Sequence, residues 1–276
     1  IKVKQVEKVS IFGKQYEVID AEPTLTTSSN NTSDASGLYK STATNTGNPT
    51  YYFRGNVTNN YVSFAGQTWR IVRINEDGTI RIVMQDGINN NANIAFNSNY
   101  NNYTYMYYTN SQAKTTLESW YQTNIGSKSN LAKTVATGAY YCEQAKVKDD
   151  DSYTSGNATM FTYDKYTPDF KCTTDGNGKG IVNASVGLLT YDEVVYAGGY
   201  GKSNMNYYLY NNTYFLTMSP AGFTSSSSYV WRVNNSGYIS SCNVFNSNAV
   251  RPVLNLTADT QISDGDGTSE NPFVVE

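Results

Sequence analysis

The stretch YFLTMSPAGFTSSSSYVWRVNNSGYISSCNVFNSNAVRPVLNL, residues 214–256, alternates strand-forming residues with small polar and aromatic ones. Trp231 and Gly237 have the character of scaffold positions within it. The residues between them are Ser, Asn, Tyr and Phe, and such residues dominate adaptable binding surfaces because Tyr supplies rigid contact area while Ser and Asn supply hydrogen bonds. The pattern predicts strands that display a contact surface and perform no chemistry.

The composition favours an extracellular, β-rich protein. The chain has 276 residues, enough to bury a sizeable core, and only 16% of them are charged, against about a quarter in an average domain. Aromatic residues make up 14%, with 25 Tyr, and the net charge is −3. This charge provides no basic field that would attract nucleic acid. The alternative is a soluble intracellular domain of unusual composition.

The absence of histidine narrows the possible chemistry. It excludes a Ser–His–Asp or Cys–His arrangement and any imidazole metal site. Acid–base work would fall to carboxylates, Tyr or Lys. Glu118, Asp192 and Glu193 are scattered carboxylates that helix caps and solvated helix faces explain better than an acid–base pair. The sequence therefore predicts no enzyme.

Residues 264–270, DGDGTSE, carry alternating oxygen ligands and so suggest calcium. The segment is too short for an EF-hand loop, and a tight turn between two strands explains it better. We therefore expect no cofactor, with calcium as the weak alternative.

Three cysteines occur, at positions 142, 172 and 242. An odd number in a secreted chain indicates one bridge and one free thiol. Cys142 and Cys172 flank a long polar segment, so we predict a disulfide between them that closes a surface loop, with Cys242 alone. In a reducing compartment all three would remain thiols. No apolar run approaches the length of a membrane span, and we expect Ile1 to follow a processing site or an artificial boundary.

Three regions differ in pattern. Residues 1–22 carry alternating β-branched residues around Phe12-Gly13-Lys14, which predicts a hairpin or a strand that pairs with a neighbouring molecule. Residues 23–50 are Thr, Ser, Asn and Gly with almost no apolar content, which predicts a linker or a long surface loop. Residues 51–276 would form the binding domain.

Local signals predict several elements of that domain. A hairpin is expected at 68–74 and 80–84, and a helix over 112–124, whereas the Asn- and Tyr-rich residues 86–110 are expected to be irregular. Thr190 and Glu193 have the spacing of a capping box. Further strands are predicted at Tyr214–Met218, Tyr229–Asn234, Tyr238–Asn243, Val250–Leu256 and Pro272–Val275.

The larger side chains have expected structural roles. Trp69, Trp120 and Trp231 should lie in or near the core. Arg251 precedes Pro252 in an otherwise apolar strand, so we expect it to hold a carboxylate or backbone carbonyls beneath the binding surface.

The chain carries, in this order, the motifs YYFRG (51–55), WRIVR (69–73), GLLTYDEV (187–194), AGG (197–199), SP (219–220), AVRPV (249–253) and GDGTSENP (265–272). From about Ala21 onward it thereby resembles a group of uncharacterised cell-surface proteins of gut Firmicutes and related bacteria. From Gly187 onward it is similar to the C-type-lectin-like fold in its formylglycine-generating-enzyme-like version.

That fold also carries the variable proteins of diversity-generating retroelements, in which mutagenesis of Asn codons produces Asn, Tyr, Ser, Phe, Asp and Cys at displayed positions. The resemblance implies a displayed set with that inventory, Cys242 included. The chain departs from the pattern because about twenty residues follow Leu256, whereas variable segments usually lie at the extreme C-terminus. The reactive cysteine arrangement of the enzymatic members has no counterpart here, so the resemblance carries over no catalysis. The displayed set comprises 225–229, 234–235, Tyr238, 240–243 and 245–248.

The sequence thus predicts a strand-rich α+β fold: a C-type-lectin-like domain with few short helices and long polar loops, preceded by an N-terminal strand or hairpin. Its predicted function is adhesion or display at the cell surface, through a protein or glycan ligand on another cell, a phage or a host surface. Alternating strand residues face opposite ways, so only some candidates can share one surface. The candidate contacts are Phe223, Ser226, Tyr229, Asn234, Tyr238, Asn243, Phe245 and Asn246.

Two other functions remain open. A subunit of a surface filament or pilus would donate residues 1–22 to a neighbour's sheet edge and so self-assemble. A carboxylate-based glycosidase is the third possibility.

Overall fold

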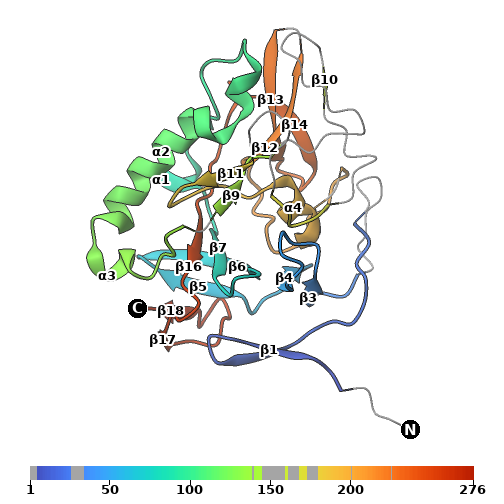
Figure 1. The fold of residues 1–276 in the computed structure, drawn as a ribbon, viewed down its shortest axis with the longest axis vertical. Coiled ribbons are helices and arrows are strands. Elements are labelled where there is room, and N and C mark those ends of the chain that lie inside the picture. Colours follow the sequence, from blue (N-terminus) through green and yellow to red (C-terminus); the bar gives the residue numbers. More distant parts are fainter. Residues whose placement is uncertain are drawn as a thin grey trace.

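The protein is a strand-rich α+β structure with few short helices, as the sequence predicts. The computed structural model describes residues 5–25, 34–138, 140–144, 159–160, 168–172, 180–199, 201–224 and 226–276. In Figure 1, a central sheet lies below helix α4 (Tyr191–Ala197) and a second, upright sheet lies above it, while helix α2 (Gln112–Tyr121) runs along the left flank. None of the described helices is long and apolar enough to cross a membrane.

The central sheet is built around the predicted hairpin, which the structure confirms. Its turn contains Gly78, whose φ of 85° suits glycine. The last strand of the chain pairs in parallel with β5, so the C-terminal segment extends the sheet on that side. The strand order is β16 (Val253–Leu256), β7 (Ile80–Met84), β6 (Gln67–Ile74), β5 (Tyr61–Phe64), β18 (Phe273–Val275) and β17 (Ile262–Asp264), with β4 (Thr50–Arg54) paired to β6 and β3 (Gly37–Ser41) to β4.

The second sheet contains residues 215–243 of the segment quoted first, whereas residues 253–256 of that segment belong to the central sheet. Strand β12 (Phe215–Thr224) is buried along almost its whole length, whereas β13 (Ser227–Val233) alternates between buried and half-buried residues. That alternation is expected of a sheet that packs on one face. The order is β10 (Thr159–Met160), β12 (Phe215–Thr224), β13 (Ser227–Val233) and β14 (Ile239–Asn243). Two small sheets pair β9 (Tyr140–Cys142) with β11 (Ile181–Asn183), and β8 (Ile94–Ala95) with β15 (Ser247–Asn248).

The two main helices begin where the sequence predicts. The Ser111 side chain accepts a hydrogen bond from the Lys114 amide and caps α2. Helix α4 has the predicted capping box and ends at Gly198, whose φ is 117°. All seven α4 residues are buried, so this helix is a core element. The remaining helical turns are α1 (Ile88–Asn91), η1 (Tyr103–Met106), η2 (Tyr108–Asn110), η3 (Gln122–Gly126) and α3 (Ser129–Ala132).

The N-terminal residues form the predicted hairpin, β1 (Lys8–Ile11) and β2 (Lys14–Glu17), and it packs on its own chain. Ile11 and Tyr16 are buried at 1% and 6% exposure. The Tyr16 hydroxyl donates to the Asn59 carbonyl at 2.5 Å, and the Phe12 and Phe273 rings are in contact. The apolar side chains of the hairpin are therefore buried against residues of the same molecule.

The prediction of a polar linker or long surface loop over 23–50 is wrong for residues 37–41, which form β3. Leu38 and Tyr39 are both buried, and the Tyr39 ring stacks on Tyr52 of β4. Two adjacent apolar side chains are enough to hold a short strand once β4 offers a free edge. Asp34 also forms an ion pair with buried Arg54 at 2.8 Å.

Buried arginines hold loops by donating to backbone carbonyls. Arg251 donates to Met84 and Leu209 at 2.9 and 2.6 Å, which confirms the structural role predicted for it. Arg70 donates to Val57, and Arg54 to the last turn of α4. Such charge-assisted bonds are stronger than neutral ones. Trp69 is fully buried and Trp120 and Trp231 are partly buried, as predicted.

Replacing Ile11 by Ala tests whether the hairpin is part of the core. Removal of a buried Ile side chain costs about 3 kcal/mol of unfolding free energy, and we expect that loss in urea-induced unfolding. Val6→Ala is the control, since Val6 is 51% exposed, and should change stability by less than about 0.5 kcal/mol. Equal stability of both variants would show that the hairpin is not docked.

Candidate functional site

The predicted contact residues divide between the two ends of the β13–β14 hairpin. Tyr229 pairs with Asn243 at one end, and Val233 pairs with Ile239 beside the connecting turn at the other. Four residue steps separate these pairs, about 13 Å along the strand. One surface patch therefore cannot contain the whole predicted set. Ser226, Tyr229, Asn243, Phe245 and Asn246 belong to the first end, whereas Asn234 and Tyr238 belong to the turn.

Several predicted contact residues are structural. Phe223 is buried at 5% exposure and Asn243 at 9%. The Asn243 side chain accepts a hydrogen bond from the Phe245 amide, and that of Asn234 accepts from the Tyr238 amide, so both shape turns. Phe223 and Asn243 are thus removed from the contact surface, while Tyr229, Asn234 and Tyr238 are half-buried and Ser226 is exposed.

The expectation that Cys242 is displayed is wrong. Cys242 is 4% exposed and lies opposite Val230, which is fully buried, on the core side of the hairpin. Burial raises the pKa of its thiol to about 11, which makes it unreactive at neutral pH. The predicted Cys142–Cys172 disulfide is confirmed, with 5.5 Å between the Cα atoms.

An exposed aromatic pair occupies the first end of the hairpin. The rings of Phe245 and Tyr100 meet at 5.0 Å between centroids and an interplanar angle of 68°. Their exposures are 46% and 43%. Phe245 belongs to the predicted set, whereas Tyr100 comes from the Asn-rich segment expected to be irregular. The structure thus brings together two loops that are far apart in the sequence.

Buried Ser228 joins these two loops. Its amide donates to the Tyr100 carbonyl at 2.8 Å, and its hydroxyl donates to the Asn102 carbonyl at 2.5 Å. The Ser228 carbonyl accepts from the Val244 amide, and the Val244 carbonyl accepts from the Asn97 amide. The aromatic pair is therefore displayed on a backbone fixed at several points.

Three asparagines surround the rings. Asn99 and Asn101 flank Tyr100, Asn246 follows Phe245, and all three are exposed. Among the described residues, their side-chain amides make no hydrogen bond. No charged residue occurs in 87–113 or in 233–250. We call Tyr100, Phe245 and these three asparagines the aromatic patch.

Sequence reasoning found two of the five residues of the aromatic patch, Phe245 and Asn246. The composition of 97–108 resembles that of 225–248, and this was the available signal for Tyr100. Composition does not reveal which loops meet, because that depends on the β8–β15 pairing and on Ser228.

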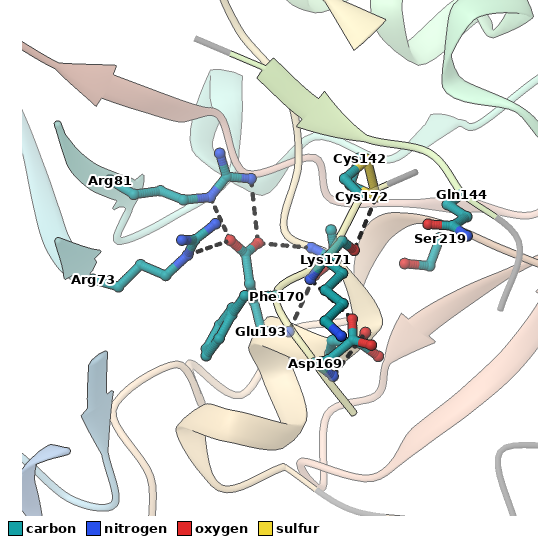
Figure 2. Close-up of a pocket in the computed structure, with 12 residues that line it drawn as sticks. Arg73, Arg81, Cys142, Gln144, Asp169, Phe170, Lys171, Cys172, Glu193 and Ser219 are labelled. Carbon is teal, nitrogen blue, oxygen red and sulfur yellow. Dashed lines mark hydrogen bonds and ion pairs between the residues drawn. A yellow bond between two sulfur atoms is a disulfide. The ribbon is translucent and has the colours of Figure 1, made fainter. Parts of the chain in front are cut away.

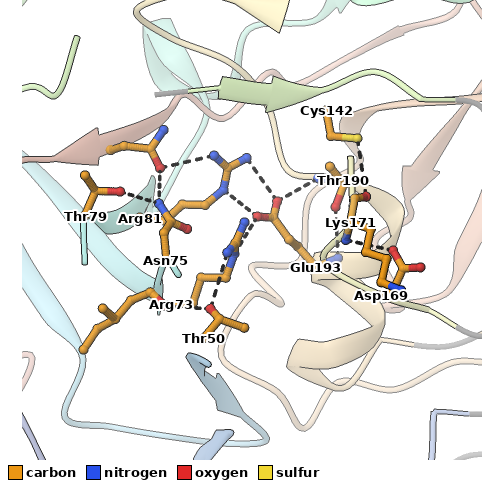
Figure 3. A network of polar contacts seen from close by, with 12 residues as sticks. Thr50, Arg73, Asn75, Thr79, Arg81, Cys142, Asp169, Lys171, Thr190 and Glu193 are labelled. Carbon is orange, nitrogen blue, oxygen red and sulfur yellow. Dashed lines mark hydrogen bonds and ion pairs between the residues drawn. The ribbon is translucent and has the colours of Figure 1, made fainter. Parts of the chain in front are cut away.

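A second polar cluster surrounds Glu193 at the start of α4 (Figure 2). One carboxylate oxygen contacts Arg81 Nε at 2.5 Å and Arg73 Nε at 3.3 Å. The other accepts from Arg81 Nη2 at 3.2 Å and from the Thr190 amide at 3.0 Å. Figure 3 shows the network continuing from Arg73 to Thr50. It also continues from Arg81 to Asn255, whose side-chain oxygen accepts from Asn75, and Asn75 in turn donates to Thr79. Both oxygens are engaged, so the carboxylate has no free position for acid–base work.

The hollow beside this cluster is small, with a volume of about 30 Å³, which is room for about one water molecule. Ser219, Asp192 and the disulfide line it. Asp192 and Glu193 are 5% and 2% exposed, so the expected solvated face is wrong for both, whereas the expected capping role of Glu193 is right.

The charge state of Glu193 follows from its surroundings. Burial raises the pKa of this carboxyl, but the guanidinium groups of Arg81 and Arg73 and the Thr190 amide outweigh burial and hold the pKa below its ordinary value of 4.5. The group is therefore ionised at neutral pH.

The segment that suggested calcium is a tight turn. The Asp266 side chain accepts from the amide and hydroxyl of Thr268, and Gly265 and Gly267 have φ values of 103° and 83°. Within the described part of the chain, no group of three or more Cys, Asp or Glu side chains could hold a metal ion.

A larger groove of about 910 Å³ lies between the N-terminal segment and β3. Tyr52 and Tyr196 line it together with residues 5–7, 18–23 and 40–43. Glu7, one of these residues, is ion-paired with Lys40 at 3.1 Å.

No protein-family model, curated protein or solved structure matches this chain. The functional argument therefore depends on the geometry alone.

Glu193→Gln tests the buried cluster. Neutralising this carboxylate leaves two guanidinium groups without their partner, and we expect a loss of about 3–5 kcal/mol in the free energy of unfolding at pH 7. A carboxyl whose folded pKa is lowered contributes stability above about pH 4.5 and loses it as the pH falls through the folded value. Urea unfolding between pH 3 and 7 should show this loss in the wild type only.

Glu118→Gln is the matched control, because Glu118 is 43% exposed and, in the described part of the chain, pairs only with Lys114 on the same helix. Its effect should stay below about 0.5 kcal/mol. If both variants lose the same free energy, the Glu193 cluster does not hold the fold.

Proposed function

We propose that the protein is an extracellular binding protein whose contact surface is the aromatic patch. The observation that carries the proposal is the pair of exposed rings, Tyr100 and Phe245, contributed by two separate loops that Ser228 joins. The two rings would be the anchors of binding.

The physical argument rests on exposure and rigidity. Aromatic side chains exposed next to each other gain free energy when a partner covers them. Tyr and Phe have few rotatable bonds, and fixed backbones lower the entropic cost of association. The exposed amides of Asn99, Asn101 and Asn246 add hydrogen-bonding groups beside the rings.

The extracellular location is supported by the Cys142–Cys172 disulfide, which persists in oxidising compartments. The low charge content and the many Asn, Ser, Thr and Tyr residues agree with it. The proposal includes no catalysis, because the most elaborate carboxylate site, at Glu193, is fully engaged by Arg81, Arg73 and Thr190.

If the segment is diversified, as the resemblance to retroelement variable proteins implies, we propose that diversity is confined to exposed positions such as Ser226, Phe245 and Asn246. Filament assembly by donation of residues 1–22 is a weaker proposal, because Ile11 and Tyr16 already pack within the same chain.

The double variant Tyr100→Ala/Phe245→Ala tests the proposal. The probe is a panel of intact epithelial and bacterial cells incubated with fluorescently labelled protein. Loss of two central anchors should weaken binding at least tenfold, since a truncated aromatic anchor typically costs more than about 1.4 kcal/mol. Flow cytometry over a concentration series gives the apparent affinity.

Met205→Ala is the control, because Met205 is 63% exposed and lies outside the aromatic patch. It should bind as the wild type does, and thermal unfolding should show that all variants are folded. Undiminished binding by the double variant, or no binding of the wild type to any cell, would contradict the proposal.

A further inference from the structure

We propose that the ligand of the aromatic patch is a neutral glycan, bound without a metal ion. This inference rests on the function proposed above and adds the chemical class of the ligand.

The two rings suit the apolar face of a sugar. An aromatic ring carries negative charge on its face and positive charge at its edge, so it attracts the weakly positive C–H groups on one side of a pyranose. Tyr100 and Phe245 meet at 68°, so the pair offers apolar surface in two directions. A sugar residue can therefore stack on one ring while its neighbour in the chain contacts the other.

The surrounding amides suit sugar hydroxyls. Each side-chain amide offers two N–H donors and one carbonyl acceptor, and a hydroxyl both donates and accepts. The amides of Asn99, Asn101 and Asn246 are exposed and bonded to no described residue. They can exchange water for hydroxyls without breaking protein contacts, and neutral exposed groups lose little on partial desolvation.

The lack of charge in the two segments that carry the aromatic patch separates glycans from other ligands. Residues 87–113 and 233–250 contain no Asp, Glu, Lys or Arg. Arg232, which precedes the second segment, donates to Asn248 at 3.1 Å and lies over the Tyr214 ring at 4.9 Å. Anionic glycans and nucleic acids need basic partners, which the segments that carry the aromatic patch do not supply. Protein interfaces use Tyr as an anchor but typically add Arg or Trp, and the aromatic patch contains neither of these two, so a neutral saccharide fits best.

Metal-independent binding follows from the donor set. The aromatic patch contains amides and aromatic rings but no carboxylate. Amide oxygens can bind calcium, but calcium affinity rises with the number of charged ligands, and this donor set has none. Binding should therefore persist in EDTA. It should also persist in 1 M NaCl, because screening acts on charges.

The first experiment repeats the cell-binding assay after mild periodate oxidation and borohydride reduction of the cells, which destroys vicinal diols of sugars. Binding by the wild type should fall at least tenfold. If binding survives periodate but still depends on Tyr100 and Phe245, the glycan inference is overturned and the proposed binding function stands. If binding is insensitive to both, the proposed function fails.

The second experiment uses an array of protein-free oligosaccharides, neutral, sialylated and sulfated, with and without EDTA. Neutral members should bind with EDTA present, and Asn99→Ala/Asn246→Ala should weaken that binding about three- to tenfold. Asn235→Ala is the matched control, since Asn235 is equally exposed at the opposite turn of the hairpin. Preference for charged glycans, loss in EDTA, or no binding to any array member would overturn the inference.

Discussion

The buried ion pair between Glu193 and Arg81 joins the first turn of α4 to the central sheet, and the arrangement of both sheets depends on it. The same carboxylate caps the helix through the Thr190 amide and contacts Arg73 of the neighbouring strand. A buried charge is costly unless every partner is present. This requirement fixes α4 in one position, between the central sheet below and the β12–β14 sheet above (Figure 1).

The other buried arginines hold loops in place in the same way, through hydrogen bonds from a buried guanidinium group. Arg70 and Arg251 donate to carbonyls of the 207–209 region, and Arg54 donates to the last turn of α4. In a chain with long polar loops and few helices, many loop carbonyls have no partner in regular secondary structure. The buried arginines donate charge-assisted hydrogen bonds to such carbonyls. The result is a framework on which irregular segments, including those of the aromatic patch, can be rigid.

Local sequence signals correctly predicted the features that depend only on residues close in the sequence. The β6–β7 hairpin, the Ser111 and Thr190 caps and the Gly198 stop all follow from short-range backbone geometry, and the structure confirms them. The Cys142–Cys172 bridge followed from counting cysteines, and the structural role of Arg251 from its apolar surroundings.

The predictions that failed concern features that depend on tertiary contacts. The burial of Cys242 is set by which face of β14 meets the core, and composition does not specify that face. Strand β3 forms because β4 offers an edge to two apolar residues in a polar segment. The partnership of Tyr100 with Phe245 depends on Ser228, which the sequence presents as one serine among several. The structure therefore places only some members of the predicted contact set on one surface, and beside them it places Tyr100, which the set did not include.

The central claim is that the aromatic patch is displayed on a rigid backbone, and amide hydrogen exchange measured by NMR tests it most directly. The amides of Ser228 and Asn97 donate across the two loops, to the carbonyls of Tyr100 and Val244. The account predicts that they exchange as slowly as amides inside the β13–β14 ladder, because opening them requires the loops to separate. Exchange as fast as that of exposed loop amides would contradict it, since the rings would then belong to two independently moving loops.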